Sequence, residues 1–262
     1  MKEKLTIIKI GGMIIDHPQR LDSFLDQVAA LPGKKVLIHG GGKLATDLAQ
    51  QMGVAQKMVD GRRITDTATL KIVTMVYAGY INKNLVASLN ARGCNAVGIS
   101  GADGKLIQAH IRKHSTIDFG WVGDIDTVDV DLLTSLLASR FLPIIAPITS
   151  DTNGQLLNTN ADTIAATLAV ALSRLFEVQL VYAFEHPGVL RHLEDPDSVI
   201  PQMNDALYQQ LLKEQVITGG MMPKLQNAFN TLTQGVEKVI IGDAVQLYDL
   251  LSGKAGTTLI HE

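Results

Sequence analysis

Short apolar runs alternate with longer segments of helical spacing along the whole chain, and this alternation constrains the fold more than any other feature. Unbroken apolar strands between amphipathic helices are typical of βαβ units around a buried parallel sheet. The pattern therefore predicts an α/β protein with a mainly parallel sheet. The expected strands are residues 5–10, 35–38, 95–99, 141–145, 177–182 and 238–241. The expected helices are residues 21–31, 43–52, 68–92, 130–139, 161–175, 204–214 and 223–234.

Composition excludes several classes of protein. The 262 residues are 46% hydrophobic with a formal net charge of −3, which argues against disorder and provides no broad basic field for nucleic acid. Cys94 is the single cysteine, so no internal disulfide forms and a reducing compartment is the simplest setting. The first ten residues lack a signal-peptide core, and every apolar run is shorter than the roughly 20 residues of a membrane helix. We expect a cytoplasmic protein without membrane or nucleic-acid partners.

Turn residues mark a division of the chain. The stretch DTNGQ at residues 151–155 interrupts the strand–helix pattern, and we place a lobe boundary there. This predicts an N-terminal lobe over residues 1–155 and a C-terminal lobe over residues 156–262, sharing one continuous sheet. The polar, irregular segment 105–123 is expected to form a hairpin excursion from that sheet.

Two of the expected strands end in glycine turns. Gly11 and Gly12 follow the first strand, and Gly41 and Gly42 follow the second. Glycine at the carboxyl end of a parallel strand lets backbone N–H groups approach a phosphate. Lys9 stands inside the first apolar strand, where a lysine is costly unless it meets an anion. Strand–helix turns need glycine in any α/β protein, so this packing role is the alternative; neither Walker nor dinucleotide spacing is present.

A third glycine turn precedes the expected helix 223–234. Thr218, Gly219 and Gly220 form this turn, and Lys224 follows at the positive end of the helix. Cations favour the opposite end of a helix, so a bound anion would resolve the conflict. Simple solvent exposure of Lys224 is the alternative.

Polar residues next to these turns are candidates for binding a substrate. Asn158 and Asp162 are four residues apart at the start of an apolar helix, and Asp162 is suited to pairing with two lysines. Helix capping by Thr159 or Asn160 is the alternative explanation of that segment. Arg62 and Arg63 lie beside a turn and offer planar forks for a carboxylate, unless they are ordinary surface arginines. The histidines show no metal-ligand spacing, so we predict no protein metal site.

The order of eight short motifs resembles the amino-acid kinase family, and within it the acylglutamate kinase branch. The resemblance runs from the first strand to the last. HGGG, D-G-x-R-x-T and N-x-N-A-D are the motifs more specific to that branch. The motifs are IIKIGG (7–12), IHGGGK (38–43), VDGRRIT (59–65), GISGADG (98–104), LNTNAD (157–162), PGVL (187–190), TGGMMPK (218–224) and GTTLI (256–260).

The resemblance implies a three-layer αβα sandwich whose N-terminal lobe binds an acylated glutamate and whose C-terminal lobe binds ATP. It implies transfer of the γ-phosphoryl group to the γ-carboxylate of N-acetyl-L-glutamate, the second step of arginine biosynthesis, with Mg²⁺ bound mainly through the nucleotide phosphates. N-succinyl-L-glutamate is an alternative acceptor. Another carboxylate or carbamate kinase of the same fold, and a non-catalytic amino-acid or nucleotide sensor, are further alternatives.

The resemblance also implies a role for each candidate residue. Lys9 and Lys224 stabilise the transferring phosphoryl group, and Asp162 orients both lysines. Arg63, rather than Arg62, clamps the α-carboxylate of the substrate, and Asn158 holds the α-carboxylate and amide region. The nucleotide region departs from the family pattern, because Phe184-Glu185 replaces the usual Thr-Asp. Backbone donors to substrate and phosphate are Gly41, Gly42, Gly11 and Gly12, and the remaining nucleotide-binding candidates are Glu185, Gly188, Thr218, Gly219 and Gly220.

Assembly is a further expectation from the resemblance. Arginine-inhibited members of the family carry an extra N-terminal helix that links dimers into a hexamer, and the first strand here starts at about residue 5. We expect a homodimer without that arginine-responsive assembly. The apolar helix around residues 72–89 is a candidate dimer contact, and burial within the monomer explains its composition equally well.

Overall fold

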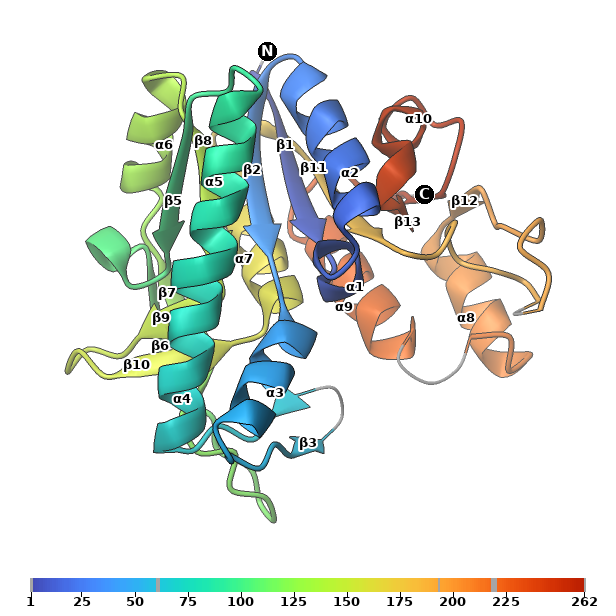
Figure 1. Ribbon diagram of the computed structural model, residues 1–262. Coiled ribbons are helices and arrows are strands. Elements are labelled where there is room, and N and C mark those ends of the chain that lie inside the picture. Colours follow the sequence, from blue (N-terminus) through green and yellow to red (C-terminus); the bar gives the residue numbers. More distant parts are fainter. Residues whose placement is uncertain (1, 60–61, 193, 218–220, 262) are drawn as a thin grey trace.

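An eight-stranded sheet runs through the centre of the computed structural model, which describes residues 2–59, 62–192, 194–217 and 221–261 (Figure 1). The strand order is β12-β14-β13-β11-β1-β2-β8-β5, and only the β13–β14 pair is antiparallel. All six expected strands are present. The strands are β1 (Lys4–Ile10), β2 (Lys34–His39), β5 (Ala96–Ser100), β8 (Leu142–Ala146), β11 (Glu177–Phe184), β12 (Gln202–Met203), β13 (Lys238–Asp243) and β14 (Thr257–Leu259).

Helices cover both faces of this sheet and complete the predicted αβα sandwich (Figure 1). Each face buries its own apolar cluster, which is the reason that the strands read as unbroken apolar runs. One face carries α1 (Gly12–Ile15), α2 (Pro18–Ala30), α3 (Gly42–Gln51), α4 (Thr67–Thr74), η1 (Met75–Ile81), α5 (Asn82–Ala91) and α10 (Leu247–Leu251). The other carries α6 (Asp131–Ala138), α7 (Ala161–Ser173), α8 (Asp205–Lys213) and α9 (Met221–Thr233).

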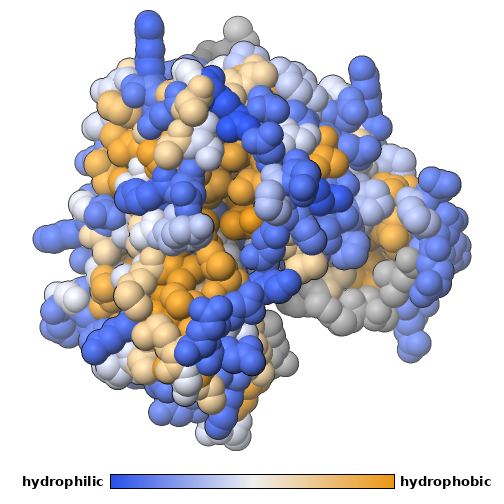
Figure 2. Space-filling view, in the orientation of Figure 1, coloured by the Kyte–Doolittle hydropathy of each residue, from blue (hydrophilic) through white to orange (hydrophobic). Residues whose placement is uncertain are grey.

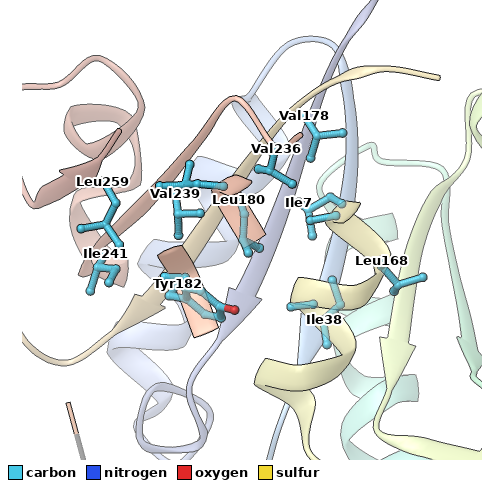
Figure 3. Close-up of a cluster of buried hydrophobic side chains, with 14 of the residues drawn as sticks. Ile7, Ile38, Leu168, Val178, Leu180, Tyr182, Val236, Val239, Ile241 and Leu259 are labelled. Atoms are coloured by element: carbon cyan, nitrogen blue, oxygen red, sulfur yellow. The ribbon is translucent and has the colours of Figure 1, made fainter. Parts of the chain in front are cut away.

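Strand β1 lies in the middle of the sheet and sends alternate side chains to the two faces. Leu5 and Ile7 are buried with α7 and α9, whereas Ile8 and Ile10 are buried on the opposite face. Figure 3 shows part of the first cluster, where strand side chains such as Ile7 gather beside α7. Because side chains alternate along a strand, Lys9 lies on the same face as Ile7, at the end where α7 begins. The period of two therefore directs this lysine towards α7.

A small barrel stands at one end of the sheet and forms one wall of the site. Its strands close in the order β10-β7-β6-β9, and the expected excursion contributes the antiparallel pair β6–β7. The turn 151–155 joins β9 to β10. It is stabilised by Asp151 Oδ1, which accepts hydrogen bonds from the backbone of Asn153 and Gln155. The barrel strands are β6 (Ile107–Ile111), β7 (Val122–Val128), β9 (Ile148–Ser150) and β10 (Leu156–Thr159), and a separate hairpin pairs β3 (Met58–Val59) with β4 (Arg62–Arg63).

The long expected helix 68–92 contains a change of helical geometry. It is continuous from α4 to α5, but the middle segment η1 is a π-helix, a type found mostly as single turns near functional sites. Large apolar side chains on this segment reach solvent, with Met75 51% and Tyr80 65% exposed. Figure 2 shows apolar side chains on the face between the long helix and α3. Within the described part of the chain, no helix is long and apolar enough to cross a membrane.

Candidate functional site

Two cavities open beside the carboxyl ends of β1 and β2, where ligands bind in open α/β sheets. The barrel-side cavity, of about 220 Å³, lies between the glycine turns, the β3–β4 hairpin and β10. The α9-side cavity, of about 150 Å³, lies between the first glycine turn, the end of β11 and the start of α9. Lys9, Gly12 and Asp162 line both cavities. These three residues therefore stand where a group would pass from one cavity to the other.

An ion pair between Lys9 and Asp162 forms this junction. Lys9 Nζ lies 2.6 Å from Asp162 Oδ1, and the two side chains are 14% and 22% exposed. Burial by itself raises the pKa of Asp162, but Lys9, with smaller contributions from Lys224 and Arg62, more than offsets burial and holds that pKa below its usual value. Tyr182 supports the helix end by donating to the Asp162 carbonyl at 3.3 Å. The carboxylate is thus ionised and surrounded by cations.

Lys224 approaches the same carboxylate from the α9 side. Its ammonium lies 4.8 Å from the centroid of the Phe184 ring, and its side chain is exposed. Phe184 is buried beneath it, and Glu185 lines the same cavity. Gly188 lines neither cavity. It is packed against Thr257 and Val199, because a Cβ there would come within 2.9 Å of both side chains. Thr218, Gly219 and Gly220 lie outside the described residues.

The two glycine turns meet the cavities through backbone groups. Gly11 donates to the Ala183 carbonyl at 2.9 Å, and a Cβ there would lie 3.3 Å from Phe184 Cβ, so this glycine also serves packing. Gly41 has φ 142°, and a Cβ would meet Ile81 Cδ1 at 2.2 Å. Gly42 begins α3, whose N-cap Gly41 makes no side-chain cap. The helix α3 therefore begins beside the barrel-side cavity, which Gly41 lines, with no acidic residue in its first turn.

A hydrogen-bonded network of buried and half-buried polar groups forms the opposite wall of the barrel-side cavity. Arg63 is only 5% exposed and donates to Gln56 and to Thr46 Oγ1, the latter at 2.8 Å. Thr65 Oγ1 donates to the Arg63 carbonyl at 2.8 Å and accepts from Asn158 Nδ2 at 3.0 Å. The network links β4 to β10. It brings together the arginine and the asparagine that the sequence singled out.

Capping and cavity lining both occur in the segment 157–162. Asn160 Oδ1 accepts from the backbone N–H of Thr163 at 3.0 Å and so caps α7. Asn158 instead lies in β10 and lines the barrel-side cavity with Asp162. The capping alternative is therefore correct for Asn160, and the four-residue spacing of Asn158 and Asp162 places both at one cavity.

Arg62 and Tyr77 are cavity residues to which sequence reasoning assigned no role in the site. Arg62, set aside in favour of Arg63, is half-buried and lines the barrel-side cavity as well as a neighbouring one between α7, α9 and β7. Burial, and then Arg112, lowers the pKa of Arg62, while Asp124 and Asp162 oppose that shift. Tyr77 of η1 also lines the barrel-side cavity, and burial raises the pKa of its hydroxyl beside Arg63. The adjacent arginines in the sequence could have indicated that Arg62 lines the cavity as well. A tyrosine within an apolar helix gives no such indication for Tyr77.

Comparison with known proteins identifies the class. The model of the amino acid kinase family matches residues 4–243, and the chain belongs to that family. It is 53% identical over 241 residues to a Bacteroides fragilis protein named acetylglutamate kinase, with 92% of each chain covered. It is 51% identical over 261 residues to the acetylglutamate kinase of Cytophaga hutchinsonii, covering 98% of this chain and 99% of that one.

A solved structure shows the same fold at low sequence identity. Carbamate kinase from Giardia lamblia bound to AMP-PNP superposes with a TM-score of 0.72 at 16% identity, covering 99% of both chains. The shared fold agrees with the three-layer architecture, and its strand-end cavities are the place where this fold class binds ligands.

Proposed function

We propose that the protein is a kinase that transfers the γ-phosphoryl group of ATP to the γ-carboxylate of N-acetyl-L-glutamate, yielding N-acetylglutamyl 5-phosphate for arginine biosynthesis. The observation that carries the proposal is the Lys9–Asp162 ion pair at the junction of two cavities. One cavity is lined by carboxylate- and amide-binding groups, and the other by a second lysine. The relatives named acetylglutamate kinase, at about half identity over nearly the whole chain, support the same reaction.

The barrel-side cavity receives the acceptor in this proposal. Arg63 offers a planar fork that matches the α-carboxylate, and its half-buried partners Gln56 and Thr46 hold the fork in place. Asn158 holds the α-carboxylate and amide region. Backbone N–H groups at Gly41 and Gly42 face the acceptor. The γ-carboxylate then lies towards Lys9.

Phosphoryl transfer needs positioning and charge neutralisation more than covalent chemistry from the protein. An oxygen of the acceptor carboxylate attacks the γ-phosphorus as the bond to the departing ADP breaks. The acceptor is ionised at neutral pH, so no general base is required. Lys9 neutralises the phosphoryl oxygens from the junction and Lys224 from the α9 side. Asp162, ionised because its pKa is lowered, orients the lysines and does not take a proton.

The α9-side cavity receives the nucleotide phosphates in this proposal. Gly11, Gly12 and Glu185 line it. Thr218, Gly219 and Gly220 would bind other parts of the nucleotide, as the family resemblance implies. The lobe 1–155 would then contribute most of the acceptor site and the lobe 156–262 most of the nucleotide site, with Asn158 and Gly11 crossing this division. Among the described residues, no group of three or more His, Cys, Asp or Glu side chains is placed to hold a metal ion. In this proposal Mg²⁺ would be held mainly by the nucleotide phosphates, where it would neutralise their charge.

A second acceptor is favoured by one observation. Arg62 brings another cation to the barrel-side cavity, beyond the arginine that clamps the α-carboxylate. N-succinyl-L-glutamate carries one more carboxylate than the N-acetyl compound, on the acyl group. A half-buried guanidinium is suited to pair with that carboxylate. N-succinyl-L-glutamate is therefore the second candidate.

A coupled assay of ADP release tests the proposal and separates its alternatives. N-acetylglutamate, N-succinylglutamate, glutamate, aspartate and carbamate are compared at saturating ATP and Mg²⁺. No turnover of either acylglutamate would refute the proposed reaction, and ligand binding without turnover of any acceptor would favour a sensor. Arg62→Gln should raise KM for the succinyl compound by about tenfold and leave KM for the acetyl compound nearly unchanged, as expected for loss of one charge-assisted hydrogen bond.

We further propose a cytoplasmic homodimer whose contact includes η1. Met75 and Tyr80 are large apolar side chains exposed on that segment, and burial against a second copy would remove them from water. Sedimentation equilibrium of the wild-type chain and of Tyr80→Glu tests this, with a shift towards monomer expected for the variant. A monomeric wild-type protein would refute the dimer.

A further inference from the structure

His39 connects the end of β2 to the glycine loop at residues 40–42. Its side chain is completely buried, and Nδ1 lies 2.8 Å from the carbonyl oxygen of Gly40. On the other side of the ring, Nε2 lies 3.3 Å from Nδ2 of Asn82. Asn82, the first residue of α5, is itself only 1% exposed. A buried side chain thus reaches the loop from the helix behind it.

The partners of Asn82 and His39 determine which atom carries each proton. Ile144 O is a pure acceptor 3.0 Å from Asn82 Nδ2, so the amide nitrogen must face it. Lys83 Nζ, a pure donor, lies 3.0 Å from Asn82 Oδ1 and requires the same orientation. The remaining hydrogen of Nδ2 therefore points at His39 Nε2, which must accept. Nδ1 then carries the proton and donates to Gly40 O.

Close packing holds the two ends of this connection. A Cβ at residue 98 in β5 would lie 1.9 Å from Asn82 Oδ1, so only a glycine at this position leaves room for the Asn82 amide. At the loop, Gly41 lies against Ile81, where a Cβ would come within 2.2 Å of Cδ1. The loop is therefore held between the imidazole and the last turn of η1. Gly40 and Gly41 line the barrel-side cavity and not the α9-side cavity.

We propose that Asn82 and His39 are positioning residues that hold the backbone of residues 40–42 in the shape that binds the acylglutamate. This inference rests on the proposed function for its ligand. A single His39 tautomer, protonated at Nδ1, fixes the Gly40 carbonyl and with it the direction of the following N–H groups. The two side chains touch neither substrate, and their effect is transmitted through the loop.

The ring remains neutral under the conditions in which the enzyme would work. Burial lowers the pKa of His39 to about 4; the Gly40 carbonyl opposes the shift, and the charge of Lys83 adds to it. A protonated ring would place Nε2–H against the amide hydrogens of Asn82. The tautomer is therefore the same throughout the neutral range.

Steady-state kinetics tests the inference with matched variants. His39→Leu and Asn82→Ala should each raise KM for the acylglutamate by about tenfold and leave KM for ATP within about twofold, as expected for loss of one positioning hydrogen bond. His39→Asn, which keeps a donor near the Nδ1 position, should recover most of that loss. Asn90→Ala is the control, because Asn90 also lies in α5 and hydrogen-bonds β5 through Ala96.

Kinetics overturns the inference if His39→Leu and Asn82→Ala raise both KM values alike. The inference is also overturned if Asn90→Ala raises KM for the acylglutamate as much as Asn82→Ala does. The same holds if His39→Asn does not restore a lower KM than His39→Leu. His39→Leu, Asn82→Ala and His39→Asn each replace a buried side chain, so all three should lower stability. Only His39→Asn keeps a donor near the Nδ1 position, so recovery of KM in this variant separates positioning from general destabilisation.

Nitrogen-15 NMR of the imidazole tests the inference without any turnover. The wild-type ring should show protonation at Nδ1 and a bare Nε2 at neutral pH, whereas Asn82→Asp should move a proton to Nε2. Backbone amide signals of residues 40–42 should shift in Asn82→Ala and not in Asn90→Ala. A wild-type Nε2–H tautomer, or unmoved loop signals, refutes the inference. Failure of every acceptor in the wild-type assay refutes only the proposed function.

Discussion

The two cavities that meet at Lys9 and Asp162 differ in how their polar groups are held. On the barrel side, Arg63 and Thr65 are buried and bonded to one another and to neighbouring side chains. On the α9 side, Lys224 is exposed, and Glu185 has a side chain 36% exposed. The barrel side is organised by the protein itself. The α9 side presents charges to solvent.

Burial is the physical reason for this difference. A polar group removed from water must find partners inside the protein, and these partners also determine its geometry. An exposed ammonium is satisfied by water and keeps its rotational freedom until an anion orders it. The proposed acceptor site is therefore preorganised, whereas the proposed nucleotide site gains its order from the ligand. Substitutions on the two sides should differ accordingly in their effects on KM, kcat and stability.

The largest effect is expected at the junction. Lys9→Met removes the cation from both cavities and leaves the Asp162 carboxylate without its nearest partner. We expect kcat to fall by about 10³-fold or more and stability to fall by about 2 kcal/mol. Steady-state kinetics and urea unfolding measure the two effects. Lys4→Met, in the same strand with an exposed ammonium, is the matched control; equal losses in both variants would contradict a role at the junction.

The next effect separates the two cavities. Lys224→Met should lower kcat by about 10²-fold, because it removes one donor to the transferring group. Unlike Lys9→Met, it should leave the unfolding midpoint nearly unchanged, since the exposed side chain supports little of the fold. A loss of stability similar to that of Lys9→Met would show that the α9 side is organised by the protein as well.

A third variant tests the preorganised side. Arg63→Lys retains the charge but loses the fork that Gln56 and Thr46 hold. KM for the acylglutamate should rise by roughly 10- to 100-fold with KM for ATP unchanged, as expected for loss of bidentate recognition. Arg92→Lys is the control, because Arg92 pairs with Asp22 and Asp26 away from both cavities. Equal changes in KM for both substrates would remove Arg63 from the acceptor site.

The last prediction concerns acid stability and the two buried groups His39 and Asp162. The pKa of His39 in the folded state, about 4, lies below its unfolded value of about 6.5, so the unfolded chain binds a proton first as pH falls. Stability should be complete above pH 6.5 and decline by about 3 kcal/mol between pH 6.5 and 4.

Urea unfolding as a function of pH measures this decline, and His39→Asn should flatten it. Asp162 also has a lowered pKa, and its contribution is present above its unfolded value and lost only as pH falls further. Lys9→Met removes the main offset to burial, so the pKa of Asp162 should rise and the profile should change above about pH 4 as well. An unchanged slope in His39→Asn would mean that the ring is not the group that titrates.

Local patterns predicted much of the fold. All six expected strands and the main helices lie close to their expected positions, because apolar periodicity reports which side of an element is buried. The closure of the barrel and the strands β12 and β14 at one end of the sheet were not predicted. Their pairing joins short segments far apart in the chain, and nothing within two or three residues encodes a distant partner. The π-helical segment η1 was missed for a similar reason, since its sequence also suits an α-helix.

Candidate residues were predicted better than their partners. Motif order singled out Lys9, Arg63, Asn158, Asp162 and Lys224, and the structure brings these five side chains to two adjoining cavities. Gly188 was singled out as well, but it is packed away from both. Arg62 and Tyr77 were not recognised as lining residues, because neighbouring backbone conformation and helix packing decide which cavity a side chain enters.

The sequence by itself determined the α/β class, the order of the central elements, the glycine turns at strand ends and the cations beside them. These are local properties, carried by residue type and spacing. Only the tertiary structure decided that Lys9 and Asp162 meet between two cavities, that one cavity is preorganised and the other solvated, and that the partners of Asn82 select one tautomer of His39. Those features depend on distances between segments far apart in the chain. Close packing sets these distances, and no single segment encodes them.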